Sequence, residues 1–374
     1  MADWLEQEAT LRRVAAFGLP GQAGATDPRS VPPEEWPILL ARLAGRRLTG
    51  MAVAAVEEGW LSLSGQQTEE LLESQRELML QALAMERKLL VLDEAFGRAG
   101  VDFILLKGSA LAHSVYPDPS WRPFGDLDLM VRTRDWRQAC SVLERFGLPR
   151  KLPEPRPGFD ERFGKASVHG GNGDVEVDLH RTLVLGPFGL WLDPEALFGL
   201  TVPLSLGGRT LRRLDDTALL LHACMHASLG SRPPLLLPLR DVAQIAYYGE
   251  VDWSTLGELA ARWRLGAVIR HALQATSDSL GITLPLQSKT CMEMKVRRKE
   301  RGALDAYVTS RRGQGGTAIS TLKAIPGVRA KLAYLRAMLT PDREFLLART
   351  EGNGRASYAR RWSIPLRWMA KRGR

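Results

Sequence analysis

The stretch Gly125-Asp126-Leu127-Asp128-Leu129-Met130-Val131 decides the fold that we expect for this chain. Its aspartates alternate with apolar residues, which predicts a strand over 126–131 with Asp126 and Asp128 on one face. Two carboxylates at this spacing repel each other unless cations neutralise them. Because Mg²⁺ prefers oxygen ligands and is commonly held by one or two carboxylates plus substrate phosphates, we interpret the pair as a Mg²⁺ site, with Mn²⁺ as an alternative ion.

Another strand is predicted just upstream, over 101–106, where apolar and β-forming residues predominate. It ends at Lys107-Gly108-Ser109 and leads into a short helix that reaches Val115. Gly108 permits a tight turn and a close backbone approach to a ligand. Because the amides at a helix N-terminus attract anions, Gly108 and Ser109 are candidates for binding a phosphate. The loop 116–123 contains three prolines, which predicts irregular structure.

A third carboxylate is expected from a hairpin further along the chain. Its two strands, joined by the glycine-rich turn 170–173, are predicted over 166–169 and 175–183. Glu176, Asp178 and His180 alternate with apolar residues and therefore share one face of the second strand. Asp178, or alternatively Glu176, is predicted to complete the metal site.

Helical periodicity dominates the remainder of the chain. Proline breaks in the first 62 residues indicate short helices, whereas 201–214 contains a short strand-like run. Longer helices are predicted over 66–99, 134–146, 215–229, 239–248, 253–263 and 267–280. The predicted fold class is therefore α+β, with a small mixed β-sheet core, flanking helices and a mainly helical C-terminal domain. The predicted division is an N-terminal helical lead-in (1–62), a catalytic domain (63–214), a helical domain (215–310) and a basic, partly flexible C-terminal region (311–374).

Composition narrows the class of protein. With 45% hydrophobic and 25% charged residues, the chain is typical of a soluble globular protein. No apolar run approaches the roughly 18 residues of a membrane span, and the early acidic residues do not resemble a secretory signal, so we expect a cytoplasmic protein without membrane insertion. The three cysteines are widely spaced, which argues against a cysteine metal site.

The basic surplus is confined to the C-terminal part of the sequence. Residues 289–374 contain 21 Lys and Arg against 6 Asp and Glu, whereas the whole chain contains 51 and 42. Two interpretations stay open: a region that attracts nucleic acid or another polyanion, and a solvated helical surface.

Four ordered motifs together resemble one known family. They are FILLKGSAL (103–111), YPDPSWR (116–122), GDLDLMV (125–131) and VDLH (177–180). In this order they resemble the uncharacterised bacterial nucleotidyltransferase family of the DNA polymerase β-like superfold. Further similar blocks occur at 219–226, 239–243 and 252–253, so the resemblance is expected to cover roughly residues 70–350 and not the first 60.

The resemblance implies a metal-dependent nucleotidyltransferase. Such an enzyme moves a nucleoside monophosphate from an NTP, ATP among the donors, to a hydroxyl-bearing acceptor and releases pyrophosphate. The implied roles are metal binding by Asp126 and Asp128, with Asp178 as third carboxylate or base and Glu176 as its alternative. Gly108 and Ser109 are expected to contact the nucleotide phosphates. Lys107 and Arg122 are expected nearby, where a cation stabilises charge on the transferred phosphate.

Several alternatives stay open from sequence alone. The acceptor could be RNA, a small molecule, a peptide or a protein, and the oligomeric state is unknown. A non-catalytic nucleotide- or partner-binding protein with the same fold is the competing function. His222 and His226 have a spacing that suits Zn²⁺, although a packed helix pair is favoured. Tyr116, Trp121 and Phe124 either stack on a nucleobase or cover the core.

Overall fold

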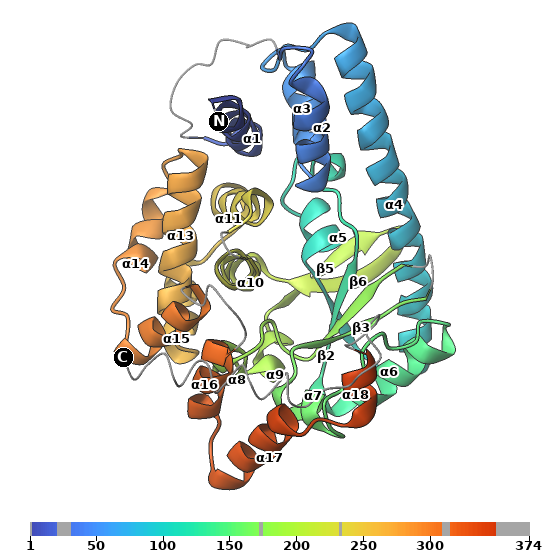
Figure 1. Cartoon of the computed structure of the whole chain (residues 1–374), viewed down its shortest axis with the longest axis vertical. Helices are drawn as coiled ribbons and strands as arrows, with labels where there is room; N and C mark the ends of the chain where they lie inside the picture. The colour runs from blue at the N-terminus through green and yellow to red at the C-terminus, as the bar shows by residue number, and fades with distance from the viewer. Residues whose placement is uncertain (1, 21–30, 172–174, 232–233, 309–314, 349–374) are drawn as a thin grey trace.

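A six-stranded mixed sheet lies at the centre of the computed structural model, with strand order β3-β4-β2-β1-β6-β5 (Figure 1). The structure describes residues 2–20, 31–171, 175–231, 234–308 and 315–348. The strands are β1 (Phe103–Leu106), β2 (Leu127–Val131), β3 (Ala166–His169), β4 (Val177–His180), β5 (Thr201–Leu206) and β6 (Arg209–Leu214). This mixed sheet with many surrounding helices confirms the predicted α+β class.

The pairing of the central strands determines which side chains share a face. β1 pairs antiparallel with β2, and β2 pairs parallel with β4, with Asp128 directly opposite Asp178. β3 and β4 form the predicted antiparallel hairpin, whose turn falls partly outside the described residues. β5 and β6 form a second hairpin that joins the sheet through a parallel pairing of β6 with β1. The short strand-like run 201–214 is therefore a full part of the sheet.

Two predictions from the sequence are corrected, one on the end of a strand and one on the structure of a loop. The strand predicted over 175–183 ends at His180, because the chain then turns away so that the amides of Arg181 and Thr182 bond to the Lys165 carbonyl. The prediction of wholly irregular structure over 116–123 is wrong, because a 3-10 turn forms over Pro119–Trp121. The Asp118 carboxylate caps this turn by accepting a hydrogen bond of 2.7 Å from the Ser120 amide.

Helices cover both faces of the sheet and extend well beyond it. α4 (Gly65–Arg98) is the predicted long helix and begins with a capping box formed by Ser64 and Gln67. α6 (Trp136–Arg145) packs beside α4 on the same face of the sheet, against apolar residues such as Leu105 and Leu129. The N-terminal helices are α1 (Ala2–Ala16), α2 (Trp36–Gly45) and α3 (Thr49–Glu57), in agreement with the short helices expected there.

The opposite face of the sheet looks toward the helical half of the chain. Ile104, Leu106 and Met130 project into a core that also contains residues of α1, α3 and the helices after Asp215. Those helices are α10 (Asp216–Leu229), α11 (Leu236–Tyr248), α12 (Trp253–Arg262) and α13 (Gly266–Leu280), all predicted from sequence. Because one core joins the first 62 residues to the helical half, the predicted division into domains stays a prediction.

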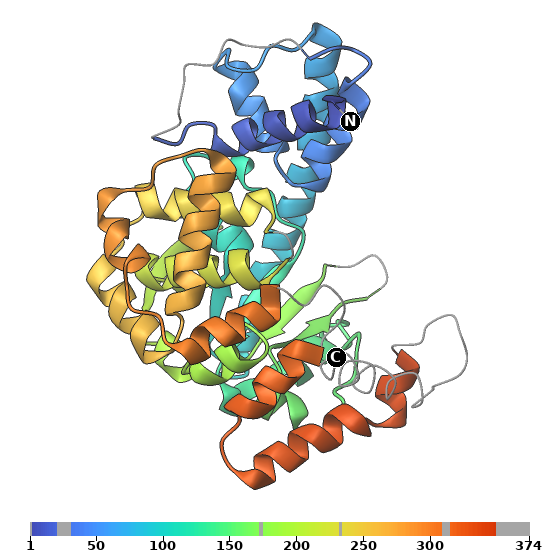
Figure 2. The same cartoon turned by 60° about the vertical axis from the view of Figure 1, so that its left-hand side comes forward.

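Shorter helices complete the fold. Figure 2 shows the N-terminal helices at one end of the molecule and the last helices at the other. The remaining helices are α5 (Lys107–Ala112), α7 (Phe159–Phe163), α8 (Pro187–Trp191), α9 (Pro194–Leu197), α14 (Lys289–Met292), α15 (Arg298–Val308), α16 (Gly315–Ala324), α17 (Val328–Leu339) and α18 (Arg343–Ala348). Among the residues that the structure describes, no helix has the length and apolar character needed to cross a membrane.

The loop 116–123 is held from outside by α3 and α4. The Gln75 side-chain amide donates a hydrogen bond of 2.7 Å to the Ser120 carbonyl, and Thr49 donates to Gln75. α3 approaches so closely that a Cβ on Gly50 would lie 2.0 Å from the Ser120 oxygen. The first 62 residues therefore help to position the loop that leads into β2.

Substituting Gly50 tests this close approach. Gly50→Ala is expected to lower the free energy of unfolding by about 1–3 kcal/mol, because backbone atoms must move to admit the methyl group. Gly97→Ala is the control, since its Cβ would meet nothing within 4 Å, and it is expected to stabilise α4 by about 0.5–1 kcal/mol. Urea unfolding measures both, and equal stability of the two variants would contradict the proposed packing.

Candidate metal and nucleotide site

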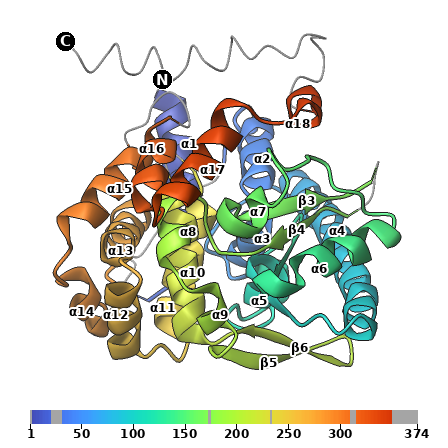
Figure 3. The same cartoon turned by 90° about the horizontal axis from the view of Figure 1, so that it is seen from below.

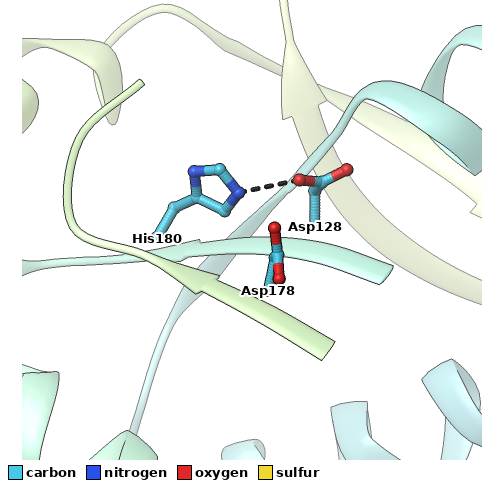
Figure 4. A group of neighbouring side chains, drawn as sticks. All are labelled: Asp128, Asp178 and His180. Atoms are coloured by element: carbon cyan, nitrogen blue, oxygen red, sulfur yellow. Dashed lines mark hydrogen bonds and ion pairs between the residues drawn. The ribbon is translucent and has the colours of Figure 1, made fainter. Parts of the chain in front are cut away.

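Three polar side chains converge on the sheet face that looks toward the helical half. The possible ligand atoms of Asp128, Asp178 and His180 all lie within 4.8 Å of one another (Figure 4). Their convergence follows from the parallel pairing of β2 with β4, which sets Asp128 opposite Asp178, and from strand alternation, which adds His180. A buried group of this kind has the donor atoms that a divalent cation requires.

Asp128 is the most strongly paired member of this group. His180 Nε2 lies 2.7 Å from Asp128 Oδ1, and the Lys107 ammonium donates to the same oxygen. Burial alone would raise the pKa of Asp128, but the His180 hydrogen bond and the Lys107 charge outweigh it and hold that pKa well below its usual range. Asp128 is therefore ionised at neutral pH.

His180 supports Asp128 as a neutral donor. Burial, followed by the charge of Lys165, lowers the pKa of His180 to about 4. Nδ1 lies 3.3 Å from the Thr182 carbonyl, farther than the 2.7 Å that separates Nε2 from Asp128, so we assign the proton to Nε2. In this tautomer His180 orients Asp128 and leaves the carboxylate oxygens as the ligands that Mg²⁺ prefers.

Asp178 carries the clearest sign of an unfilled coordination requirement. Its Oδ1 is buried and accepts no hydrogen bond from the described residues. Burial, and then the negative charge of Asp128, raises the pKa of Asp178 to about 6. A buried acceptor without a donor is costly, and a cation between Asp128 and Asp178 would satisfy both carboxylates. The residues present therefore fit a bound divalent ion.

The other predicted carboxylates lie apart from this group. Asp126 precedes β2, is partly exposed, and lies 3.7 Å from the guanidinium of Arg47. Glu176 precedes β4 and forms an ion pair with Lys151 on the surface. Of the two alternatives for the third carboxylate, only Asp178 approaches Asp128, whereas the metal contact predicted for Asp126 stays a prediction.

The turn between β1 and α5 has an unusual backbone. Lys107 adopts φ 44°, and Gly108 has φ 15° and ψ −106°, which is not helical. A Cβ on Gly108 would lie 3.1 Å from that of Phe124, so the absence of a side chain allows the close packing. Ser109 is buried, and its hydroxyl donates to Glu86 at 3.3 Å. The phosphate contacts predicted for Gly108 and Ser109 stay predictions.

Arg122 has a different setting from the one that its motif suggests. Its Nε and Nη2 donate to the two carboxylate oxygens of Asp241 at 2.8 and 2.9 Å, and its Nη1 donates to the Pro123 carbonyl. The Tyr116 hydroxyl also donates to Asp241 at 2.8 Å. In this geometry Arg122 fastens the loop 116–123 to α11, and the nucleotide contact predicted for it stays a prediction.

The aromatic residues of this loop pack into the interior. Tyr116 and Phe124 are buried, and the ring of Trp121 lies 5.6 Å from that of Phe17. This arrangement supports the second of the two interpretations from sequence, in which these residues cover the core.

Two further groups lie within electrostatic range of the carboxylates: Lys165, which was not predicted as a site residue, and His222, which was considered only as a possible Zn²⁺ pair with His226. Lys165 precedes β3, and its pKa is lowered by burial and then by Lys107, while Asp128 and Asp178 act in the opposite direction. His222 is buried on α10, and its Nε2 has no hydrogen-bond partner among the described residues. No sequence pattern around Lys165, which follows Gly164, indicates a site residue. The alternation in β4, by contrast, predicted that His180 shares a strand face with Asp178.

A buried histidine outside the carboxylate group links stability to pH. His169 lies with Nε2 2.9 Å from the Ser167 hydroxyl, and burial lowers its pKa to about 4. Between pH 6.5 and 4 the unfolded chain therefore binds a proton that the folded chain does not, so stability is lost as pH falls. We expect His169→Gln to reduce the pH slope of the unfolding free energy by up to about 1.4 kcal/mol per pH unit. Urea unfolding across this window measures the slope, and parallel curves for the two proteins would contradict the prediction.

Comparison with known protein families agrees with the sequence motifs. A family described as "Uncharacterised nucleotidyltransferase" matches residues 32–281, which is more than half of the chain. The chain belongs to this nucleotidyltransferase family. The match begins earlier and ends earlier than the predicted extent of 70–350, so it includes α2 and α3 and excludes α14 to α18.

One solved structure resembles the nucleotidyltransferase chain. Its title is "Crystal structure of an antigenic nucleotidyltransferase-like protein from Paracoccidioides brasiliensis". The two share 15% identity over 55% of this chain and 96% of that one, with a TM-score of 0.33. A search of curated proteins gives no significant match.

Proposed function

We propose that this chain is a metal-dependent nucleotidyltransferase that moves a nucleoside monophosphate from an NTP to a hydroxyl-bearing acceptor and releases pyrophosphate. One observation carries the proposal: Asp178 Oδ1 is buried without a hydrogen-bond donor among the described residues, beside a second buried carboxylate, Asp128. Membership of a nucleotidyltransferase family supports it. ATP among the donors and a cytoplasmic location belong to the same proposal.

Asp128 and Asp178 would hold the divalent ion, Mg²⁺ or Mn²⁺, with Asp126 as a further ligand at the exposed rim. Such an ion, when bound, neutralises charge on phosphate oxygens and polarises them. His180 keeps Asp128 oriented through its 2.7 Å contact. Glu176 is left out of the proposed site because Lys151 already pairs with it.

The remaining roles in the proposal concern charge and the proton. Lys107 and Lys165 supply positive charge beside the carboxylates, where it would stabilise the triphosphate and the departing pyrophosphate. Asp178 is also proposed to accept the proton of the attacking hydroxyl, because it lies beside Asp128, where the ion and the reacting groups would meet. Gly108 and Ser109 are proposed to lie beside the phosphates.

The test combines each of the four NTPs, labelled at the α-phosphate, with the full chain, a cell extract as the source of acceptor, and Mg²⁺, Mn²⁺ or EDTA. We expect metal-dependent release of pyrophosphate and labelling of one acceptor class. Binding of NTP without turnover in any combination would instead favour a non-catalytic nucleotide-binding protein.

Metal binding itself is expected to be visible without turnover. Saturating Mn²⁺ should raise the unfolding free energy of the wild-type chain, by about 2.7 kcal/mol at a hundred times its Kd. Asp178→Asn should lose most of this gain, whereas Glu176→Gln should keep it, because Glu176 pairs with Lys151 at the surface. Thermal unfolding with and without Mn²⁺ measures the gain, and its loss in Glu176→Gln alone would reassign the third carboxylate.

A further inference from the structure

A cavity of about 490 Å³, a size within the range of small-molecule sites, is lined in part by β3, the strand that pairs with β4. Its walls come from β3, the segment 183–186, α7, the C-terminal part of α10, and residues of α15 to α18. Figure 3 shows α16 and α17 close to α8 and α7, which they contact, near the point where β3 begins and β4 ends. The last helices therefore form one side of the cavity and the sheet forms the other.

The cavity and the carboxylates occupy the same face of the sheet. Ala166 and Val168 line the cavity, and they pair directly with His180 and Asp178 across the β3–β4 hairpin. Directly paired residues of antiparallel strands project to the same side. Lys165, which also lines the cavity, lies within electrostatic range of Asp128 and Asp178. A molecule in the cavity would therefore have one end beside Asp178.

The walls are mostly aromatic and aliphatic. Two rings of α7 pack against Tyr334 of α17 at centroid distances of 5.4 and 6.1 Å. The aromatic lining residues are Phe159, Phe163, Tyr307, Tyr334 and Phe345. Small-molecule sites typically combine such surfaces with placed polar groups. The polar lining side chains here, apart from the tyrosines, are Arg150, Asp160, Lys165, Ser167, His226, Thr317 and Thr321.

The charges in the cavity do not match a nucleic-acid site. A single strand of RNA would require a row of cations along its phosphates. Arg150 is neutralised by its ion pair with Asp160, and burial lowers the pKa of His226 to about 3, which keeps its imidazole neutral. Lys165 is then the basic side chain without an ion pair among the described lining residues, and it lies within electrostatic range of Asp128 and Asp178.

Part of the wall lies beyond the region shared with the family. The family match ends at residue 281, whereas Tyr307, Thr321, Tyr334 and Phe345 all follow it. The carboxylates thus lie within the family match, whereas this wall of the cavity is formed by helices that follow the match. Such a wall is a suitable place to set the choice of acceptor, because it contacts the cavity without contributing to the carboxylate group.

We propose that this cavity binds the acceptor, and that the acceptor is a hydroxyl-bearing small molecule with an aromatic or otherwise apolar body. The inference rests on the proposed function. The hydroxyl oxygen forms a bond to the α-phosphorus while the bond to the oxygen bridging the α- and β-phosphates breaks. The proton passes to Asp178, and pyrophosphate leaves with the electron pair.

The test uses 2-naphthol as a hydroxyl-bearing aromatic probe, with Mn²⁺ as a paramagnetic ion. We expect saturable binding that weakens about tenfold or more in Ala318→Trp, because the indole would fill the cavity. Met338→Trp fills it from α17 as an independent second variant, and Val328→Trp, at a position 72% exposed, is the control that keeps binding. Mn²⁺ should broaden the proton signals of the bound probe, and Asp178→Asn should reduce that broadening.

The possible outcomes separate this inference from the proposed function. Equal probe binding in wild type and both filled variants, or signals that Mn²⁺ does not broaden, overturns the acceptor site while leaving pyrophosphate release to stand. Transfer of labelled nucleotide to RNA that persists in Ala318→Trp also overturns it. Absence of pyrophosphate release from every NTP overturns the proposed function and the acceptor role with it.

Discussion

Asp128→Asn is expected to lower metal-dependent pyrophosphate release by about 10²–10³-fold, because metal coordination to phosphoryl oxygens contributes several kcal/mol. Asparagine keeps the shape of the side chain and an oxygen that can accept from His180, so the fold should persist. The substitution removes the negative charge that pairs with Lys107 and would hold the ion. Initial rates of pyrophosphate release at saturating NTP measure the effect.

Two substitutions make the interpretation of Asp128→Asn specific. Glu176→Gln removes a nearby carboxylate that pairs with Lys151, and it should leave the rate within about twofold of wild type, as expected for an exposed ion pair. Asp178→Asn should reduce the rate as severely as Asp128→Asn, because both are proposed to hold the same ion. An Asp128→Asn protein that is folded and fully active would exclude the carboxylate group as the catalytic site.

The carboxylate group could be predicted largely from local sequence. Alternation of polar and apolar residues predicts the strand face from which Asp128 projects in β2, and Asp178 and His180 in β4. The order of the four motifs along the chain indicated that these two strands belong to one site. The choice between Asp178 and Glu176 required the register of β2 against β4, which is set by pairing between segments fifty residues apart in the chain. Local pattern alone does not encode that register.

Long-range partners explain where sequence interpretation was incomplete. Arg122 lies in the proline-rich loop before β2, and the family resemblance implied a place near the phosphate, but its partner Asp241 is 119 positions away on α11. Lys165 reaches the site only because β3 pairs with β4. The packing of α15 to α18 over the cavity depends on side chains from separate segments of the chain. Such contacts depend on tertiary packing rather than on propensity.

The ion pair between Arg122 and Asp241 provides the largest expected change in stability. Both side chains are buried, and Tyr116 donates to the same carboxylate. Asp241→Leu leaves the Arg122 guanidinium buried without its counter-ion, which typically costs about 3–5 kcal/mol. Urea unfolding measures the loss, and Arg209→Ala, which removes exposed pairs with Asp93 and Glu94, should cost less than about 1 kcal/mol. A loss in Asp241→Leu no larger than that would contradict the ion pair's structural role.

The double variant Arg122→Met/Asp241→Leu separates the structural role of Arg122 from a role toward nucleotide. Replacing both members of a buried ion pair with apolar side chains of similar volume is often neutral, so stability should return to within about 1–2 kcal/mol of wild type. If Arg122 only fastens the loop 116–123 to α11, the KM for NTP should recover together with stability. A KM that stays raised in the stable double variant would show that the guanidinium contributes to nucleotide binding, because the structural contribution of the ion pair has then been restored.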